Sequence, residues 1–198
     1  MTLAAPNGVP ADPQSIPNPA LLLSPAPEST VYYRDFPPRI GFTWERAESA
    51  TRYHIQVAND LLFHERVLDE YSTRSQFVFG NLRAGSYYWR VSVVRSGGVE
   101  GTSSEPRPIT VVQDQKPPRL VLLAPGVSQP VRVDRILVRG QSEAGAKVYI
   151  NGKPAEVEAD GSFARTAALK TGVNVIVVEA VDPAGNTSYQ SRIVNRKP

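Results

Sequence analysis

The 198-residue sequence contains no cysteine, which excludes disulfide bonds, zinc–thiolate centres and thiol catalysis together. It contains only two histidines, so few side chains are suited to general acid–base chemistry or to metal binding. Long apolar runs are also missing. None approaches the roughly 20 residues of a membrane-spanning helix, and the three leucines at 21–23 are too few for the core of a signal peptide. We therefore expect no direct membrane insertion.

Excess charge is small. The net charge is +3, and the excess lies after Lys116, where the chain has 11 basic and 7 acidic residues. Arg132, Arg135 and Arg139 are near one another, but Asp134 interrupts them and no aromatic residue lies among them. We therefore expect no nucleic-acid partner. The double glycine at 97–98 lacks the helix and lysine of a phosphate loop, so we also expect no cofactor.

Prolines and glycines are plentiful, at 18 and 14, and they favour short strands joined by turns. We predict an all-β fold of two consecutive antiparallel β-sandwich (immunoglobulin-like) domains, each of roughly 100 residues. Half of the prolines fall in the first 38 residues, and residues 1–19 lack an apolar period, which predicts a flexible proline-rich tether. The two domains are expected at residues 20–115 and 116–198.

Period-two alternation predicts half-buried strands at residues 39–44 and 51–58 of the first domain. The inward side chains expected to seed its core are Ile40, Phe42, Trp44, Tyr53, Ile55 and Val57. One helical turn, capped by Asn59 or Asp60, is expected next. A later strand at 87–94 follows a turn at Gly85 and should point Tyr88, Arg90 and Ser92 outward.

In the second domain, Asn151-Gly152 predicts a two-residue hairpin, because a type I′ turn needs positive φ at both positions. A long strand at 174–182 is expected to be the last one. Its inward residues are Ile176, Val178 and Ala180, but its outward face is also apolar, with Val175, Val177 and Val181. Either a neighbouring strand or loop covers these valines, or they form an interface with the first domain or a second chain.

Trp44, the segment Tyr53-x-Ile55-Gln56-Val57-Ala58 and the turn Leu82-x-Ala84-Gly85 leading into Tyr87-Tyr88-Trp89-Arg90-Val91 resemble bacterial fibronectin type III modules. The similarity covers residues 20–115, and this bacterial variety is similar to the modules that follow the FecR domain in predicted periplasmic proteins. The resemblance implies a tyrosine whose hydroxyl bonds back to the main chain at this corner. Tyr87 and Tyr88 both fit that role.

The second half carries Gly140, Gly145, Val148, Asn151-Gly152, Asp160-Gly161-Ser162-Phe163, Gly172-x-Asn174 and Asp182-x-Ala184-Gly185-Asn186. This pattern resembles bacterial immunoglobulin-like modules, including the type found as the B domain of glucodextranase, over residues 117–196. Such modules occur in exported and cell-surface proteins. The resemblances together imply a periplasmic or extracytoplasmic location, with the signal sequence upstream of these 198 residues.

The residues offer no catalytic constellation, so we expect no enzymatic activity. His54 and His64 lack the spacing of a metalloprotease helix, and the carboxylate pairs Asp69-Glu70 and Glu156 with Glu158 show no sign of a cleft.

One candidate partner-binding surface is the outward face of strands 51–58 and 87–94. Its residues are Arg52, His54, Gln56, Tyr88 and Arg90. Arginine and tyrosine are typical of binding surfaces, although a solvated sheet face with cross-strand contacts is the alternative.

The resemblance to calcium-dependent adhesin repeats implies a second candidate, a calcium site at Asp182 and Asn186. Because calcium takes roughly six to eight oxygens, Asp160, Glu179 or Asp114 would have to converge there. The alternative is that Asp182 and Asn186 satisfy the amides of their turn.

The sequence as a whole predicts a noncatalytic spacer or protein-interaction segment of an exported bacterial envelope protein with a FecR domain, binding a protein partner in the cell envelope. The competing hypothesis is a carbohydrate- or peptidoglycan-binding accessory module. That function needs an exposed row of aromatic residues, for which Tyr32, Tyr33 and Tyr88 are the candidates.

Overall fold

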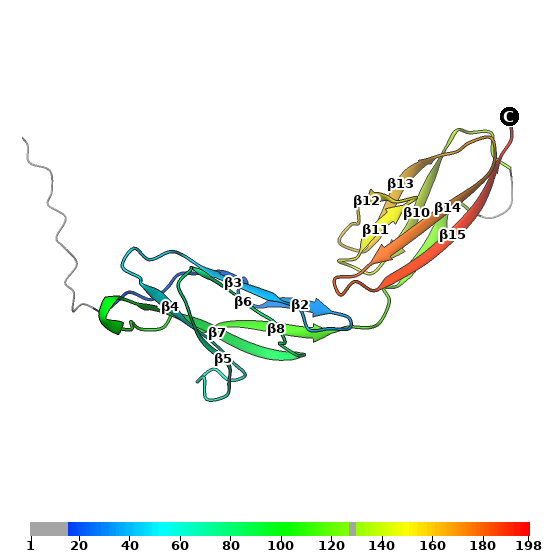
Figure 1. Ribbon diagram of the computed structural model, residues 1–198. Coiled ribbons are helices and arrows are strands. Elements are labelled where there is room, and N and C mark those ends of the chain that lie inside the picture. Colours follow the sequence, from blue (N-terminus) through cyan, green and yellow to red (C-terminus); the bar gives the residue numbers. More distant parts are fainter. Residues whose placement is uncertain (1–15, 127–129) are drawn as a thin grey trace, which may run out of the picture. The chain divides into compact units, whose positions relative to one another are not determined.

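The computed structural model describes residues 16–126 and 130–198, which are all-β apart from one short 3₁₀ helix. The chain divides into two compact units. The first contains Pro38–Val111 with the chain up to Val31, and the second contains Tyr32–Pro37 and Val112–Pro198. Each unit consists of two sheets (Figure 1), which confirms the predicted fold class. The boundaries at 20–115 and 116–198 stay a prediction, and most of the expected tether lies outside the described residues.

In the first unit, a five-stranded sheet of order β2-β8-β7-β4-β5 is joined by a three-stranded sheet of order β1-β3-β6. The strands are β1 (Leu22–Ser24), β2 (Ser29–Tyr33), β3 (Ile40–Trp44), β4 (Arg52–Ala58), β5 (Arg66–Ser72), β6 (Gln76–Phe79), β7 (Gly85–Val94) and β8 (Arg107–Gln113). The 3₁₀ helix η1 (Ser96–Gly98) lies between β7 and β8.

The core of the first unit forms where the apolar positions of the two sheets meet. All six residues expected to seed it are buried, with at most 5% of their surface exposed. Phe42 packs edge-on against Trp89 with ring centroids 5.1 Å apart, and Trp44 packs against Tyr53 at 5.4 Å. Edge-to-face aromatic pairs contribute about 0.5–1.5 kcal/mol each beyond the area that they bury. The predicted core is therefore confirmed.

The second unit pairs a three-stranded sheet, β13-β10-β9, with a four-stranded sheet, β12-β11-β14-β15. Its strands are β9 (Leu120–Ala124), β10 (Arg135–Ser142), β11 (Lys147–Ile150), β12 (Lys153–Ala155), β13 (Ser162–Ala168), β14 (Gly172–Val181) and β15 (Thr187–Arg196). The hairpin between β11 and β12 turns at Asn151 and Gly152, whose φ values are 49° and 74°. The predicted type I′ signal is confirmed.

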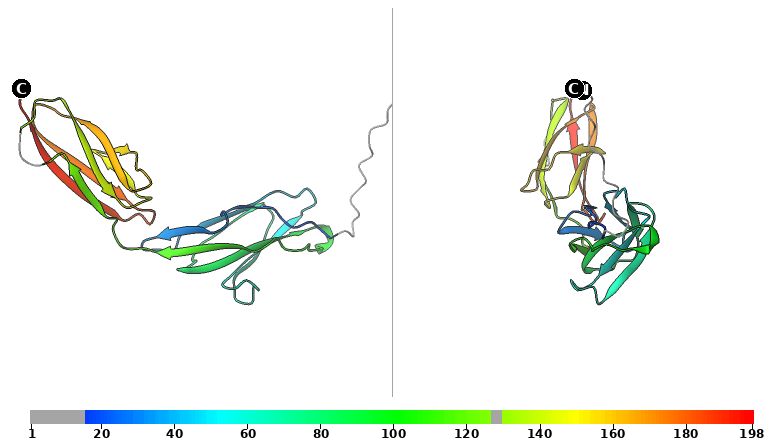
Figure 2. Two further views of the ribbon diagram at one scale, coloured as in Figure 1. Left: turned by 180° about the vertical axis from the view of Figure 1, so that it is seen from behind. Right: turned by 90° about the vertical axis from the view of Figure 1, so that its left-hand side faces the viewer.

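The expectations at two places were wrong. Residues 174–182 do not form the last strand, because β15 follows and pairs with β14 along its whole length; the two strands lie side by side in Figures 1 and 2.

The expected helical turn at Asn59 or Asp60 is a loop. The Asp60 carboxylate accepts hydrogen bonds from the main-chain nitrogens of Leu62, His64 and Glu65, and Phe63 has a φ of 61°. A left-handed residue at this point stops a helix.

A hydrogen bond at the start of β7 shows which of the two candidate tyrosines bonds back to the main chain at this corner. The Tyr87 hydroxyl donates to the main-chain oxygen of Arg83 at 3.0 Å. Tyr87 is buried and points into the core, whereas Tyr88 points to the other face of the sheet. Tyr87 is therefore the corner tyrosine.

We expect the Tyr87→Phe substitution to lower the free energy of unfolding of the first unit by about 1 kcal/mol, because it leaves the Arg83 carbonyl without this donor. The measurement is guanidinium denaturation followed by tryptophan fluorescence, since both tryptophans, Trp44 and Trp89, lie in this unit. Tyr88→Phe is the matched control. Equal losses from the two variants would contradict the assignment.

Close packing in the second unit requires glycine at position 140. A Cβ atom on Gly140 would meet the main-chain oxygen of Val121 and would lie 2.5 Å from Cζ of Phe163. The first of these contacts is with backbone, which cannot rotate away. In contrast, a Cβ on Gly126, in the same unit, would meet nothing within 4 Å.

We expect Gly140→Ala to destabilise the second unit by about 1–3 kcal/mol through overpacking. Gly126→Ala should stay within about 0.5 kcal/mol of the parent chain. Differential scanning calorimetry of the whole chain measures both variants. A loss of stability at Gly126 as large as that at Gly140 would show that the space around Gly140 does not decide the result.

Candidate functional site

The structure brings the five predicted partner-binding residues onto one face of the five-stranded sheet. We call this set the β4–β7 face: Arg52, His54, Gln56, Tyr88 and Arg90. Strands β4 and β7 are antiparallel neighbours that place Gln56 opposite Arg90. On the other side of β4, β5 places Asp69 opposite Gln56 and Tyr71 opposite His54. The face therefore extends over three strands.

His54 lies between two carboxylates. Its Nδ1 is 2.7 Å from Oε1 of Glu100, and its Nε2 is 2.5 Å from Oδ1 of Asp69. The imidazole ring stacks on Tyr71 with centroids 4.4 Å apart and 17° between the planes. Only 14% of the His54 side chain is exposed. When both ring nitrogens carry hydrogen, each donates to one carboxylate, so His54 ties β4 to β5 and to the segment that contains Glu100.

The hydrogen bonds continue from Asp69 across β4 to β7. The Gln56 amide donates to Oδ1 of Asp69 at 3.1 Å, and Nε of Arg90 donates to Oε1 of Gln56 at 2.8 Å. Burial alone raises the pKa of Asp69, but hydrogen bonds from Gln56 and His54, together with the charges of His54 and Arg66, outweigh it and lower the pKa below its usual value. Five side chains thus form one connected network: Arg90, Gln56, Asp69, His54 and Glu100.

Part of this face is covered, which corrects the expectation that it points freely into solvent. Gln56 is only 6% exposed, and Ser92, also expected to point outward, is 3% exposed beside Ser103. The loop after β4 supplies Phe63, which is 3% exposed. The Cζ atom of Arg90 lies over the Phe63 ring, 4.0 Å from the ring centroid. Burial, followed by the charge of Arg66, lowers the pKa of Arg90. The cover comes from loops, which strand alternation alone does not predict.

The remaining members of the face are more accessible. Arg52 is exposed and its guanidinium lies 4.2 Å from the ring centroid of Tyr71, while Tyr88 is half-buried. Sequence reasoning did not assign Tyr71, Asp69 or Glu100 to this face. Antiparallel pairing of the strand at 51–58 with the strand that follows it was the available signal for Asp69. Partner binding by the β4–β7 face stays a prediction.

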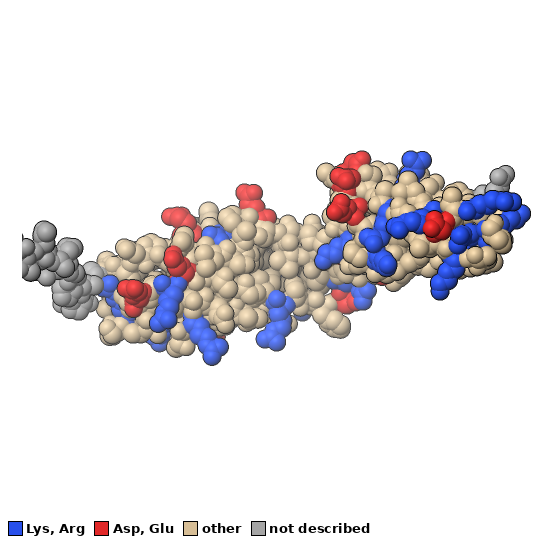
Figure 3. Space-filling view, turned by 90° about the horizontal axis from the view of Figure 1, so that it is seen from above, with Lys and Arg blue, Asp and Glu red and all other residues tan. Residues whose placement is uncertain are grey.

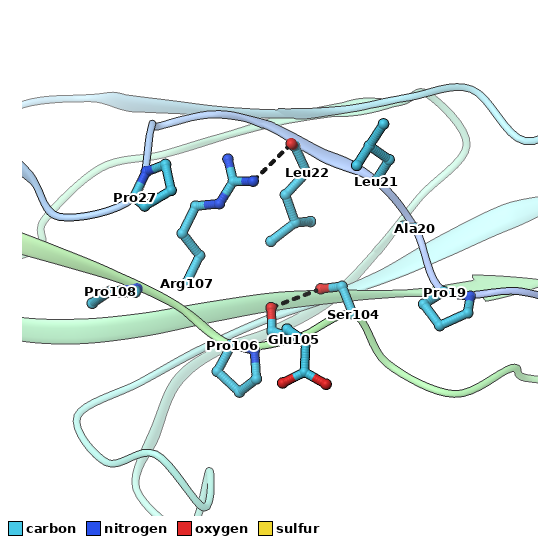
Figure 4. Close-up of a pocket in the computed structure, with 10 residues that line it drawn as sticks. All are labelled: Pro19, Ala20, Leu21, Leu22, Pro27, Ser104, Glu105, Pro106, Arg107 and Pro108. Carbon is cyan, nitrogen blue, oxygen red and sulfur yellow. Dashed lines mark hydrogen bonds between the residues drawn. The ribbon is translucent and has the colours of Figure 1, made fainter.

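A groove of about 470 Å³ lies between β1 and β8 of the first unit (Figure 4). Its lining residues are Pro19, Ala20, Leu21, Leu22, Pro27, Ser104, Glu105, Pro106, Arg107 and Pro108. The Arg107 guanidinium donates to the main-chain oxygens of Leu22 at 2.8 Å, Leu23 at 3.2 Å and Pro25 at 3.0 Å. These bonds hold the first strand to β8, so Arg107 has a structural role in the groove.

Asp182 and Asn186 lie together in the turn between β14 and β15, but they bind mainly to each other. The Asn186 main-chain nitrogen donates to Oδ1 of Asp182 at 2.8 Å, and its side-chain amide donates to Oδ2 at 2.9 Å. The same amide donates to the main-chain oxygen of Asp114 at 2.9 Å, and Asn186 is 3% exposed. Each contact satisfies a donor of the turn. Calcium binding by Asp182 and Asn186 stays a prediction.

Within residues 16–126 and 130–198, no group of three or more histidine, cysteine, aspartate or glutamate side chains is placed to hold a metal ion. Over the same residues, no helix is long and apolar enough to cross a lipid bilayer.

Glu156 and Glu158 line a groove of about 350 Å³ together with Arg139, a hollow that the sequence did not predict.

Comparison with known proteins supports the two-module architecture. Residues 118–197 match the family model described as glucodextranase, domain B. A stretch of 97 residues, 48% of the chain, is 37% identical to Bacillopeptidase F of Bacillus subtilis (strain 168) and spans 7% of that protein's length. The chain therefore covers only a small part of this curated relative.

Among solved structures, the chain is similar to the fibronectin(III)-like modules of Clostridium thermocellum CbhA. The TM-score is 0.63 at 13% identity, covering 90% of this chain and 94% of that one. At this identity the likeness concerns the fold. Together with the family match, it shows that the chain consists of tandem fibronectin III-like and immunoglobulin-like modules.

Because the pKa of Asp69 is lowered in the folded chain, its ionised form stabilises the first unit above the usual carboxyl pKa, and this contribution is lost as pH falls through the folded value. We expect Asp69→Asn to reduce the fall in Tm between pH 5 and pH 3. Since 40% of the side chain is exposed, the effect is about 1 kcal/mol or less. Tryptophan fluorescence measures Tm, and Glu48→Gln, an exposed change elsewhere in the unit, is the control. An unchanged pH profile in Asp69→Asn would contradict the prediction.

Proposed function

We propose that the chain is a noncatalytic spacer or protein-interaction segment of an exported bacterial envelope protein, and that a FecR-domain protein is its host. The connected network from Arg90 to Glu100 carries this proposal. Its imidazole, amide, carboxylate and guanidinium groups contact one another. A group that is held in this way stiffens a sheet, whereas catalysis needs a nucleophile or base directed at a substrate.

The comparisons support an accessory role. The matched stretch amounts to 7% of Bacillopeptidase F, so the similarity concerns a small part of a much longer protein. The matching family model is named as a domain within an enzyme. Modules of this kind are attached to larger hosts. The resemblance to modules of exported and cell-surface proteins supports an extracytoplasmic location for this chain.

The accessible part of the β4–β7 face is the proposed contact for a protein partner. Arg52 and Tyr88 offer a guanidinium and a ring, the side-chain types enriched where interfaces bind most strongly. His54 lies between them and is held by Asp69 and Glu100, so it presents a fixed polar group. A rigid surface loses little conformational entropy when a partner binds.

The test is retention of proteins from a bacterial envelope extract on the immobilised chain, in parallel with sedimentation against peptidoglycan. The variant Arg52→Ala with Tyr88→Ala removes the accessible groups and spares the network. The matched control, Arg39→Ala with Phe36→Ala, removes a guanidinium and an aromatic ring from exposed positions outside the face. We expect a specific protein to be retained by the parent chain and the control, and to be lost with the Arg52 and Tyr88 variant.

The other outcomes separate the hypotheses. Cosedimentation with peptidoglycan would overturn the proposal in favour of the carbohydrate- or peptidoglycan-binding alternative. Retention that survives in both variants would show that the partner binds elsewhere on the chain. Binding of neither material would leave the spacer role and remove the interaction role.

A further inference from the structure

The outer face of the four-stranded sheet in the second unit is apolar and exposed. Strand β14 presents Val173, Val175 and Val177 with 71%, 54% and 40% of their surface exposed. On β15, Ile193 is 68% and Tyr189 is 62% exposed. No described residue covers these side chains, so neither a neighbouring strand nor a loop among residues 16–126 and 130–198 hides them. We call this set of five residues the β14–β15 face.

Strand pairing places the residues of this face in regular rows. Val175 lies opposite Ile193, Val177 opposite Ser191, and Glu179 opposite Tyr189. On the other side of β14, Tyr149 of β11 lies opposite Glu179 and Lys147 lies opposite Val181. Neighbouring strands within a row are therefore about 4.8 Å apart, and successive rows on the same face are about 7 Å apart.

Charge is nearly absent from this surface. The described rows contain Lys147 and Glu179, one of each sign, and the Glu179 carboxylate accepts a hydrogen bond from the Tyr189 hydroxyl at 2.8 Å. Figure 3 shows Lys and Arg side chains on one side of the second unit. A face with balanced charge can meet a copy of itself without like-charge repulsion.

We propose that the β14–β15 face binds the same face of a second copy of this chain. The two sheets stack about 10 Å apart with their strands antiparallel, related by a two-fold axis that passes through the row of Val177 and Ser191. This inference is independent of the proposed partner contact, which lies on the first unit.

The two-fold axis determines which rows meet. The row on the axis meets itself, so Val177 faces Val177 of the second copy. The rows on either side exchange: Ile193 packs on the ring of Tyr189, and Val175 packs beside Glu179, whose carboxylate is bonded to the Tyr189 hydroxyl. Apolar side chains at one end of the face thus meet the tyrosine ring at the other.

The available area indicates a weak dimer. Both β14 and β15 are ten residues long, which corresponds to about 34 Å, and the two strands together are about 10 Å wide. The four-residue β11 adds about 14 Å by 5 Å, so the face covers about 400 Å² in each copy, or about 800 Å² in the pair. This area is below the roughly 1,000 Å² at which specific interfaces begin, so we expect a weak and reversible dimer.

The first experiment is sedimentation equilibrium of the whole chain from about 5 to 500 µM. We expect the mean mass to rise with concentration from the monomer value of 21.6 kDa toward twice that value. Leu137→Lys is the matched control, because Leu137 is 51% exposed on β10, in the other sheet of the same unit. It should dimerise like the parent chain.

Charged substitutions at Val177 test the position of the two-fold axis. Val177→Lys and Val177→Glu should each weaken the dimer at least tenfold, because each places two like charges in contact, and an equimolar mixture of the two should restore association. Val175→Thr with Ile193→Thr, which keeps β-branched side chains, should weaken it as well. Circular dichroism and the thermal transition confirm that each variant is folded.

Three results would overturn the proposal: a parent chain that stays at 21.6 kDa throughout, a dimer that Leu137→Lys disrupts and Val177→Lys does not, or a Lys and Glu mixture that stays monomeric. If the parent chain is monomeric and soluble peptidoglycan fragments shift the ring signals of Tyr149 and Tyr189 in NMR spectra, the face binds glycans and the proposal is wrong.

Discussion

Both units depend on burying the inner faces of two sheets against each other. In a strand, alternate side chains point to opposite faces, so one apolar face per strand is enough to build a core. Trp44 and Trp89 show the result, since both are almost completely buried and each packs edge-on against a ring from another strand. The second unit has a smaller core of aliphatic residues around Phe163. What each unit can do is therefore decided on its outer faces.

Sequence reasoning succeeded where a single local rule determines the structure. The six core residues of the first unit follow from alternation, and the Asn151-Gly152 hairpin follows from the need for positive φ. It failed for β15, whose sequence does not alternate between apolar and polar residues. As an edge strand, β15 has little of its surface in the core, and Val194 is its buried hydrophobic residue. Such a strand is specified by its neighbour β14, not by its own pattern.

The candidate site was predictable only in part, for a related reason. Alternation places Arg52, His54 and Gln56 on one face, but it says nothing about what covers them. Gln56 is buried because Arg90, Asp69 and the loop that carries Phe63 close over it. Glu100 reaches His54 from 46 positions away in the sequence. Contacts of this length depend on the finished topology, so a reading of single strands misses them.

The outer faces of the two units differ in polarity. On the β4–β7 face, polar side chains satisfy one another, which makes that surface rigid. On the β14–β15 face, β-branched residues stabilise the strands but leave apolar area in water. Burying that area is favourable by roughly 25 cal/mol for each Å². The chain therefore has an energetic reason to cover this face, and the near absence of charge there removes the usual electrostatic barrier to doing so.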